Sequence, residues 1–138
     1  MEYATIIHKY DSKNTNSDLS DLNENKDKNI EIKYGQIWYI KTQESKGSIQ
    51  GGTRPVIVVS NDENNTYCPT VNVIPITTRE KNELPVHTFI YSSPFKSTAL
   101  AEQITTINKN ELLSCIGELS KKEMRKLKIC IMIQLNLL

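Results

Sequence analysis

One arginine in this sequence stands where a glycine-rich loop meets an apolar run. Arg54 follows Gly51 and Gly52, precedes Pro55, and is followed at once by the strand-like residues 56–60. Proline fixes its own φ and disfavours helical backbone at the residue before it, so we expect Arg54 to be held at the root of a strand. A planar guanidinium matches phosphate oxygens. The residue is therefore a candidate phosphate clamp, although an arginine that only closes a turn would fit the same pattern.

Three further side chains could take part in the same chemistry. Thr77 ends the predicted strand 70–77, and its hydroxyl could donate or accept a hydrogen bond, although threonine is also an ordinary strand residue. His87 falls on the polar face of the predicted strand 86–91, where we expect it to be free to reach a substrate. Imidazole suits acid and base work near neutral pH, but a structural or binding role is the alternative. Glu102 could contact a substrate or hold a neighbouring loop amide.

The sequence offers no cluster of metal ligands, and we expect neither a metal nor another cofactor. The three cysteines, Cys68, Cys115 and Cys130, are odd in number, far apart and without CxxC spacing. We therefore interpret them as reduced core or loop residues.

Charge and composition divide the 138 residues into two unequal parts. Residues 1–33 carry five lysines against seven acidic side chains, whereas residues 34–138 carry twelve basic against nine acidic ones. Residues 11–29 are dominated by polar side chains, which predicts a disordered extension, either a variable tail or an arm that covers a groove or a partner. The rest is long enough for one folded domain. No segment is apolar enough to span a bilayer, so we expect a cytoplasmic protein.

The pattern from residue 34 onward predicts a mainly β fold. Apolar, β-branched runs at 36–40, 55–60 and 70–77 favour an antiparallel meander, with a polar loop at 61–65. Residues 86–91, after a loop at 81–85, and residues 98–107 indicate two more strands. Short strands at close spacing are typical of a small barrel. Pro75 inside the third strand predicts a bulge or an edge just before Thr77.

The C-terminal third changes to helical periodicity. Asn108 could cap a short helix over 109–113, and Ser120 with Glu123 has the spacing of a capping box before a helix over 121–135. One face of that helix carries an apolar stripe formed by Met124, Leu127, Ile131 and Leu135. Three more apolar side chains widen the stripe: Ile129, Cys130 and Ile133. Core packing explains such a stripe, and its width also fits a dimer contact.

Taken in order, these motifs resemble the MazF/PemK family of toxin endoribonucleases over residues 34–138. The matching segments are GSIQGGTRP at 47–55, residues 56–62, Tyr67-Cys68-Pro69-Thr70, Ile76-Thr77, Leu84-Pro85-Val86-His87 and Leu100-Ala101-Glu102-Gln103-Ile104. The resemblance implies an SH3-like barrel with short helices and a C-terminal helix. It also implies a homodimer and a MazE-type antitoxin. Its activity would be metal-independent, sequence-specific cleavage of single-stranded RNA that leaves 2′,3′-cyclic phosphate and 5′-OH ends.

The resemblance also assigns roles to individual residues. Arg54 and Thr77 match the catalytic positions, and eight residues match RNA contacts: Gln50, Gly51, Gly52, Leu84, Pro85, His87, Glu102 and Gln103. Amides and aromatic rings that could read bases include Gln50, Asn61, Tyr67 and Gln103. Two positions depart from the family pattern, because Ile49 stands where a glutamate is frequent and Thr105 where a basic residue is frequent.

Two alternatives share this fold. A CcdB-like toxin binds gyrase and cleaves nothing, but such a protein has no use for a paired arginine and threonine at a phosphate. An inactive relative that only binds RNA is compatible with the departures at Ile49 and Thr105. In the enzyme, the 2′-OH of RNA is the nucleophile, so the protein must orient it and stabilise the crowded phosphate. Guanidinium groups stay protonated in proteins, so we expect Arg54 to act by its charge rather than as a base.

Overall fold

Seven antiparallel strands form the main body of the computed structural model, which describes residues 30–41 and 53–138. The strands are β1 (Gln36–Lys41), β2 (Thr53–Val58), β3 (Thr70–Thr77), β4 (His87–Ile90), β5 (Ser97–Leu100), β6 (Thr105–Asn108) and β7 (Leu112–Glu118). Two α-helices, α2 (Asp62–Tyr67) and α3 (Lys121–Gln134), and two 3-10 turns, η2 (Ala101–Gln103) and η3 (Lys109–Glu111), complete the described part. The predictions for the polar extension before residue 30, and for Ile49, Gln50, Gly51 and Gly52, lie outside the described residues.

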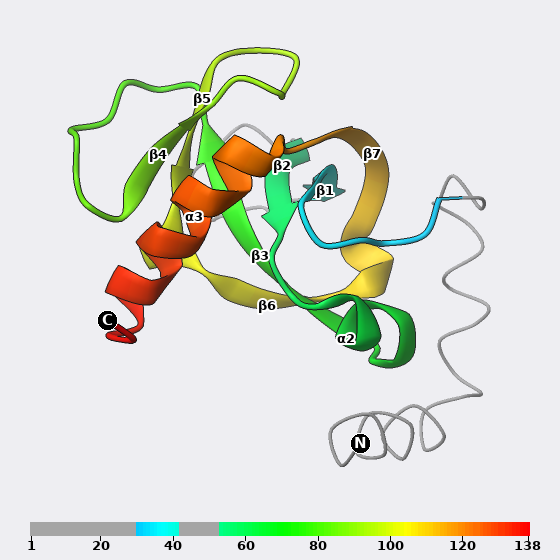
Figure 1. The fold of residues 1–138 in the computed structure, drawn as a ribbon. Helices are drawn as coiled ribbons and strands as arrows, with labels where there is room; N and C mark the ends of the chain where they lie inside the picture. Colours follow the sequence, from blue (N-terminus) through cyan, green and yellow to red (C-terminus); the bar gives the residue numbers. More distant parts are fainter. Residues whose placement is uncertain (1–29, 42–52) are drawn as a thin grey trace, which may run out of the picture.

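The strands follow the order β4-β5-β3-β2-β1-β7, and β6 lies beside β3. The predicted meander of the first three strands is confirmed, since β2 pairs with both β1 and β3. The mainly β fold with a C-terminal helix is also confirmed. The barrel, however, is open, because β4 and β7 stand at opposite ends of the described sheet and do not pair. In Figure 1, α3 crosses the sheet on the side of β4, whereas α2 lies at the far end of β3.

Both faces of the central strands are buried, each by its own apolar cluster. Alternation sends Ile57 of β2 to one face and its neighbours Val56 and Val58 to the other. The first cluster packs under α3 and contains Ile37, Ile57, Ile74, Ile76, Ile90, Leu119, Leu127 and Cys130. The second surrounds Trp38 and contains Val56, Val58, Val71, Val73 and Leu112. A register slip of one residue would exchange these two sets, so burial on both faces fixes the register of β2 and β3.

The predicted fifth strand, residues 98–107, is interrupted in its middle. Val73 and Ile76 are three positions apart along β3, but their partners, Thr105 and Ala99, are six positions apart. The three extra residues correspond to the turn η2 between β5 and β6. Ala101 of this turn is buried in the core, whereas Glu102 and Gln103 are exposed, and both flanking strands stay paired with β3.

Pro75 explains why the interruption falls there. Asn72 directs its N–H to Ser60 Oγ (3.1 Å), and its carbonyl accepts from Val59 N–H (2.9 Å), both toward the β2 side. By alternation, the backbone nitrogen of Pro75 faces the other neighbour, where η2 leaves the sheet. The sequence prediction of a bulge or an edge in the third strand is wrong, because β3 continues without a register shift through Pro75 and has a neighbour on each side. The irregularity lies in the facing strand, where the missing N–H of Pro75 breaks no ladder hydrogen bond.

Residues 61–65, predicted as a loop, begin the helix α2. Asn61 caps it, because its side chain accepts a hydrogen bond from Asn64 N–H (2.9 Å), and two acidic residues follow in the first turn. The helix contains no apolar stripe, which is why periodicity did not reveal it. As a cap, the Asn61 side chain serves the fold and is not free to read a base.

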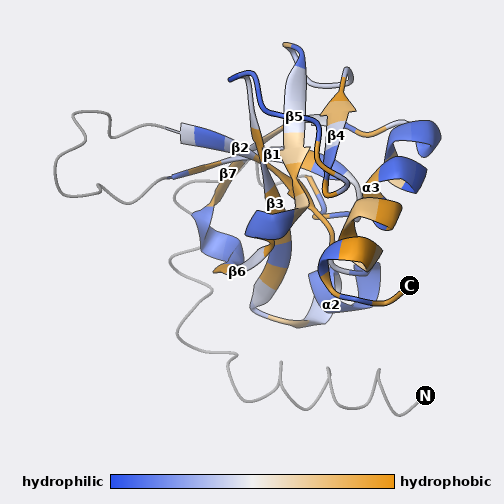
Figure 2. Ribbon diagram, turned by 90° about the vertical axis from the view of Figure 1, so that its left-hand side faces the viewer, coloured by the Kyte–Doolittle hydropathy of each residue, from blue (hydrophilic) through white to orange (hydrophobic). Residues whose placement is uncertain are grey.

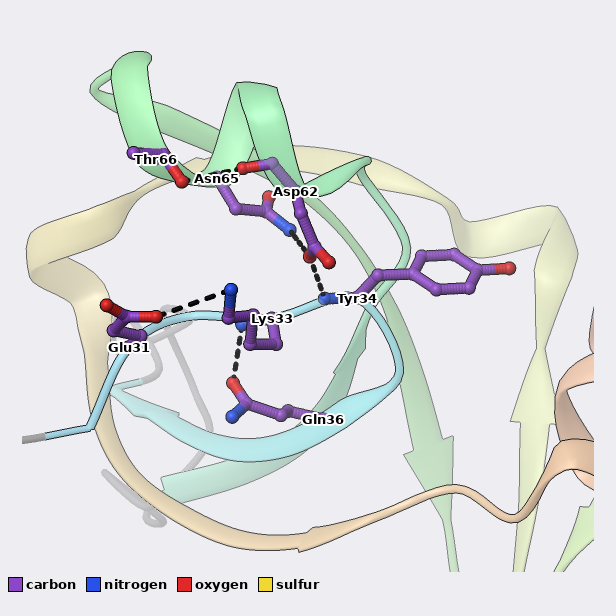
Figure 3. A network of polar contacts seen from close by, with 7 residues as sticks. All are labelled: Glu31, Lys33, Tyr34, Gln36, Asp62, Asn65 and Thr66. Atoms are coloured by element: carbon purple, nitrogen blue, oxygen red, sulfur yellow. Dashed lines mark hydrogen bonds and ion pairs between the residues drawn. The ribbon is translucent and has the colours of Figure 1, made fainter.

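A polar network anchors the residues before β1 to this helix (Figure 3). Asp62 accepts the backbone N–H of Tyr34 at 2.7 Å and the side-chain amide of Asn65 at 3.4 Å. Gln36 Oε1 accepts from Lys33 N–H (2.7 Å) and from the indole N–H of Trp38 (2.9 Å). The network therefore couples the start of β1 to the buried tryptophan and to α2.

The predicted helix over 109–113 is wrong beyond its first turn. Asn108 caps the segment as expected, and forms a capping box with Glu111, but the box closes only the turn η3. Leu112 then starts β7, where it is fully buried against the Trp38 cluster, and β7 pairs with β1. Tertiary burial of Leu112 overrides the local helix signal.

Glu123 fixes the beginning of α3. The predicted capping box is confirmed, because Ser120 Oγ accepts from Glu123 N–H (3.2 Å) and the carboxylate accepts from Ser120 N–H (3.0 Å). The same carboxylate reaches across to the end of β4, where it accepts the Tyr91 N–H (2.6 Å) and the hydroxyl of Ser92. Burial alone would raise the pKa of Glu123, but the hydrogen bonds from Ser92, Ser120 and Tyr91 lower it to about 2.

The apolar stripe of α3 is narrower than the sequence predicted. Leu127 and Cys130 are buried, and Met124 and Ile131 pack beside them, so these side chains form the inward face. Leu135 is not part of the stripe, because the helix ends at Gln134 and this leucine is 48% exposed. Ile129 and Ile133 lie on the outer side and are exposed. Figure 2 shows that the later turns of α3 are hydrophobic, whereas the first turns are hydrophilic.

We predict that acid unfolds this protein partly through Glu123. The folded pKa of about 2 lies below the usual 4.5, so the stabilisation is complete above pH 4.5 and is lost as the pH falls toward 2. The difference between these two pKa values corresponds to a contribution of at most about 3 kcal/mol to the free energy of unfolding. Urea unfolding of the wild type between pH 6 and pH 2 should show this loss. Glu123→Gln should be less stable at neutral pH and less sensitive to acid, whereas Glu80→Gln, at an exposed position, should behave like the wild type. An unchanged acid dependence in Glu123→Gln would contradict the prediction.

Candidate anion-binding site

Arg54 and Thr77 meet at the ends of two neighbouring strands. β2 and β3 pair as Val56 with Pro75 and Ile57 with Ile74. The same register, continued by two residues, puts Arg54 opposite Thr77. Both residues line one pocket of about 540 Å³, which lies at the open end of these strands. The structure therefore brings together the two residues that the sequence marked as catalytic.

The hydroxyl of Thr77 is oriented by its own backbone. Its Oγ1 accepts a hydrogen bond from the backbone N–H of Arg79 at 3.2 Å. Because a hydroxyl has one hydrogen, which this bond does not use, Thr77 keeps an O–H to donate. Where the sequence left donor and acceptor roles open, the geometry favours Thr77 as a donor to an anionic oxygen.

Two further cations line the same pocket. Arg79 and Lys81 follow Thr77 at spacings of two and four residues, and both are exposed. With Arg54 they give the pocket three positive side chains, and no acidic side chain lines it among residues 30–41 and 53–138. Sequence analysis missed Arg79 and Lys81. The signal was present in the alternation beyond Thr77, but it lay in a segment interpreted only as the start of a loop.

His87 is not free to reach a substrate, in contrast to the expectation. Its ring is only 8% exposed, with Nδ1 at 2.9 Å from the carbonyl oxygen of Asn82 and Nε2 at 2.9 Å from Glu102 Oε1. Both ring nitrogens are therefore occupied by contacts within the protein, and neither is open to a substrate. The histidine instead ties the 81–85 loop to the turn η2.

The predicted RNA contacts divide between two adjoining pockets. Gln103 lines the pocket of Arg54 and Thr77. Leu84 and His87 line a second pocket of about 280 Å³, and Lys81 lines both. Glu102 joins this group only through its contact with His87, and the exposed Pro85 lines neither pocket. Gln103 thus shares a pocket with Arg54, whereas of the other described RNA-contact candidates only Leu84 and His87 line the second pocket.

The remaining chemical groups are outside this site. Cys68, Cys115 and Cys130 form no disulfide, and burial raises the pKa of the Cys115 and Cys130 thiols, which disfavours the reactive thiolate. Within residues 30–41 and 53–138, no three His, Cys, Asp or Glu side chains gather in a way that could hold a metal ion. None of the described helices has the length and apolar character needed to cross a membrane.

The curled sheet and the cationic pocket define a small β protein with a site suited to a phosphate-like anion. Comparison with known proteins gives its family. Residues 33–135 match the family described as the PemK-like, MazF-like toxins of type II toxin–antitoxin systems. The match covers most of the chain, and the chain belongs to this family.

Individual relatives agree with the assignment. Endoribonuclease MazF from Staphylococcus saprophyticus is 39% identical over 111 residues, which cover 77% of this chain and 92% of the relative. A mycobacterial endoribonuclease solved in complex with its cognate antitoxin has a TM-score of 0.66 at 24% identity, covering 78% of this chain and 97% of its own. MazF from Deinococcus radiodurans has a TM-score of 0.64 at 17% identity, covering 78% and 98%. These two structures support the fold.

We predict that His87→Ala loosens the 81–85 loop and the turn η2 together. The substitution removes the imidazole that contacts both the Asn82 carbonyl and the Glu102 carboxylate, so the two segments lose this link. Hydrogen exchange should accelerate in both segments. Asn82→Ala is the matched control, because it keeps the backbone carbonyl that the ring contacts, and exchange should stay near the wild-type rate. Acceleration in only one segment would show that His87 does not couple them.

Proposed function

We propose that the pocket of Arg54 and Thr77 is where this endoribonuclease toxin cleaves single-stranded RNA. The observation that carries the proposal is the placement of an exposed guanidinium and an oriented hydroxyl opposite each other at the ends of β2 and β3. Family membership and the likeness to an endoribonuclease at 39% identity support the same reaction.

The reaction requires little from the protein beyond position and charge. The 2′ oxygen of the substrate attacks the neighbouring phosphorus, its proton leaves to a base, and the bond from phosphorus to the 5′ oxygen breaks. The 5′ oxygen takes up a proton, so the products are a 2′,3′-cyclic phosphate and a 5′-OH. Arg54 stabilises the two non-bridging oxygens, which carry more charge in the transition state, and Thr77 donates its hydroxyl proton to one of them.

The contacts of His87 argue against this residue as the base. A ring held at both nitrogens by acceptors cannot take a proton from the 2′-OH without breaking a contact. We assign it instead to holding Leu84 and the turn with Glu102 and Gln103 in place beside the substrate.

We predict that purified protein cuts a long RNA in excess EDTA and leaves 5′-OH ends. New 5′ ends should then accept phosphate from a polynucleotide kinase without prior phosphatase treatment. Ends that resist labelling, or cleavage abolished by EDTA, would contradict the reaction proposed above. A protein that binds the RNA but never cuts it would be the inactive relative, and one that binds only gyrase would be the CcdB-like alternative.

We predict that Arg54→Ala and Thr77→Ala each lower kcat/KM about 100-fold or more, because removal of one preorganised donor typically costs about 3 kcal/mol. Arg54→Lys should recover part of the loss, since it keeps the charge but not the planar fork. Arg125→Ala is the control, because this exposed arginine of α3 does not line the pocket. The proposal fails if the Arg54 and Thr77 variants retain full activity with unchanged melting temperatures.

We also propose a homodimer and inhibition by an acidic antitoxin segment. Ile129 and Ile133 leave an apolar strip on the outer side of α3, at a spacing that places both on one face. Carboxylates of an antitoxin would compete with RNA phosphates for the three cations of the pocket. The solved complex of a mycobacterial relative with its antitoxin supports a partner of this kind.

We predict that light scattering at micromolar concentration reports about twice the chain mass of 15.8 kDa. Ile129→Lys with Ile133→Lys should produce monomers, because like charges would meet across the two-fold interface. Arg54→Ala should weaken antitoxin binding as well as cleavage. An antitoxin whose affinity ignores Arg54 would remove the competition from the proposal, and a wild-type monomer that still cuts RNA would remove the dimer.

A further inference from the structure

We propose that Phe89 and Tyr91 form a stacking platform for RNA bases that lie beyond the phosphate bound by Arg54 and Thr77. The inference rests on the proposed function and extends it to a part of the substrate that the catalytic pocket does not contact. Neither residue is among those matched to an RNA contact by the resemblance to the toxin family.

Both rings are exposed at an edge strand and its end. β4 pairs only with β5 among the described strands; within it Ile90 is fully buried and Phe89 is 40% exposed, and Tyr91, the residue after the strand, is 67% exposed. Phe89 and Tyr91 are two positions apart, the spacing of side chains that share a face of an extended chain. Two large aromatic side chains exposed at a sheet edge favour unspecific association with other proteins. Binding of a ligand to the rings would cover this apolar surface.

Cations surround these rings. The ammonium of Lys96 lies 5.2 Å from the ring centre of Phe89 and 6.0 Å from that of Tyr91. Phe89 and Tyr91 themselves line the pocket of about 280 Å³, together with Lys81, Lys126 and the acidic Glu83. Aromatic faces beside lysines match the two parts of a nucleotide, because the base stacks on a ring and the phosphate meets an ammonium.

The platform is continuous with the catalytic pocket. Lys81 lines both cavities, so one lysine marks the passage from Arg54 and Thr77 to Phe89 and Tyr91. A single strand of RNA that leaves the cleaved phosphate can therefore pass Lys81 and lay its next bases on the rings. An acidic peptide would satisfy the lysines but has no planar group at every residue, so the paired rings favour RNA over the antitoxin.

The test uses full-length protein carrying Thr77→Ala, so that the substrate survives, and a single-stranded RNA of about 20 nucleotides with one 4-thiouridine moved along it. Ultraviolet crosslinking followed by mass spectrometry should place bases on the peptide that contains Phe89 and Tyr91. Phe89→Leu and Tyr91→Leu should each weaken the RNA Kd by about 5-fold to 100-fold, which corresponds to the roughly 1–3 kcal/mol of one base–aromatic stack. Phe89→Trp keeps an aromatic face and should retain most of the affinity.

A matched pair of lysines tests the charge. Lys96→Ala should reduce the slope of log Kd against log salt by about 0.7, the change expected for one phosphate contact to a single strand. Lys122→Ala should leave the slope unchanged, because this exposed lysine does not line the pocket of Phe89 and Tyr91.

Crosslinks that avoid the platform, with an unchanged Kd in the leucine variants, would overturn the inference while wild-type cleavage still supported the proposed function. Leucine variants that become monomeric or lose only the antitoxin would assign the rings to a protein interface and overturn it as well. A wild type that cleaves no RNA would instead remove the proposed function.

Discussion

The antiparallel pairing of β2 with β3 is the constraint on which the rest of the structure depends. Its register is fixed because the side chains of these strands are buried on both faces, Ile57 toward α3 and Val56 with Val58 toward Trp38. A slip by one residue would place each set in a cavity shaped for the other. The same register, carried to the strand ends, brings Arg54 opposite Thr77. The position of the chemical groups is thus a by-product of core packing.

The residues proposed for catalysis and those proposed for RNA recognition belong to different structural parts of this protein. Arg54 and Thr77 stand on the central, doubly buried strands, which are the least deformable part of the sheet. Leu84, Glu102 and Gln103 stand on a loop and on the turn η2, outside the regular ladder. The ring of His87 joins these two peripheral segments, so that they present one surface. A rigid scaffold with recognition residues on its connections is the common arrangement for binding sites.

Sequence analysis predicted the elements whose signals are local and strong. The run 70–77 matches β3 residue for residue, and Ser120 with Glu123 marked the start of α3. It failed where tertiary contacts decide. Leu112 lies in a strand because its side chain is buried against Trp38. The helix α2 consists of polar residues and is stabilised at its start by the capping hydrogen bond of Asn61. Neither event leaves a periodic apolar pattern.

The candidate site was predicted unevenly for similar reasons. A glycine loop, a proline and a strand end made Arg54 and Thr77 recognisable by type and order. The contacts of His87 with Asn82 and Glu102 join residues five and fifteen positions away, and no spacing rule reveals them. Arg79 and Lys81 follow the end of β3 and line the pocket through the path of the chain after that strand, so alternation alone did not assign them to the site.

The three-residue turn η2 has a consequence for how such a protein can diverge. β5 and β6 pair with β3 independently on either side of it, so the length and composition of the turn are not tied to the pairing of β2 with β3. Glu102 and Gln103 could therefore be exchanged, or the turn lengthened, without a change in the register that holds Arg54 and Thr77. For the site proposed above, this separates the residues that would contact RNA from the strands that hold the proposed catalytic pair.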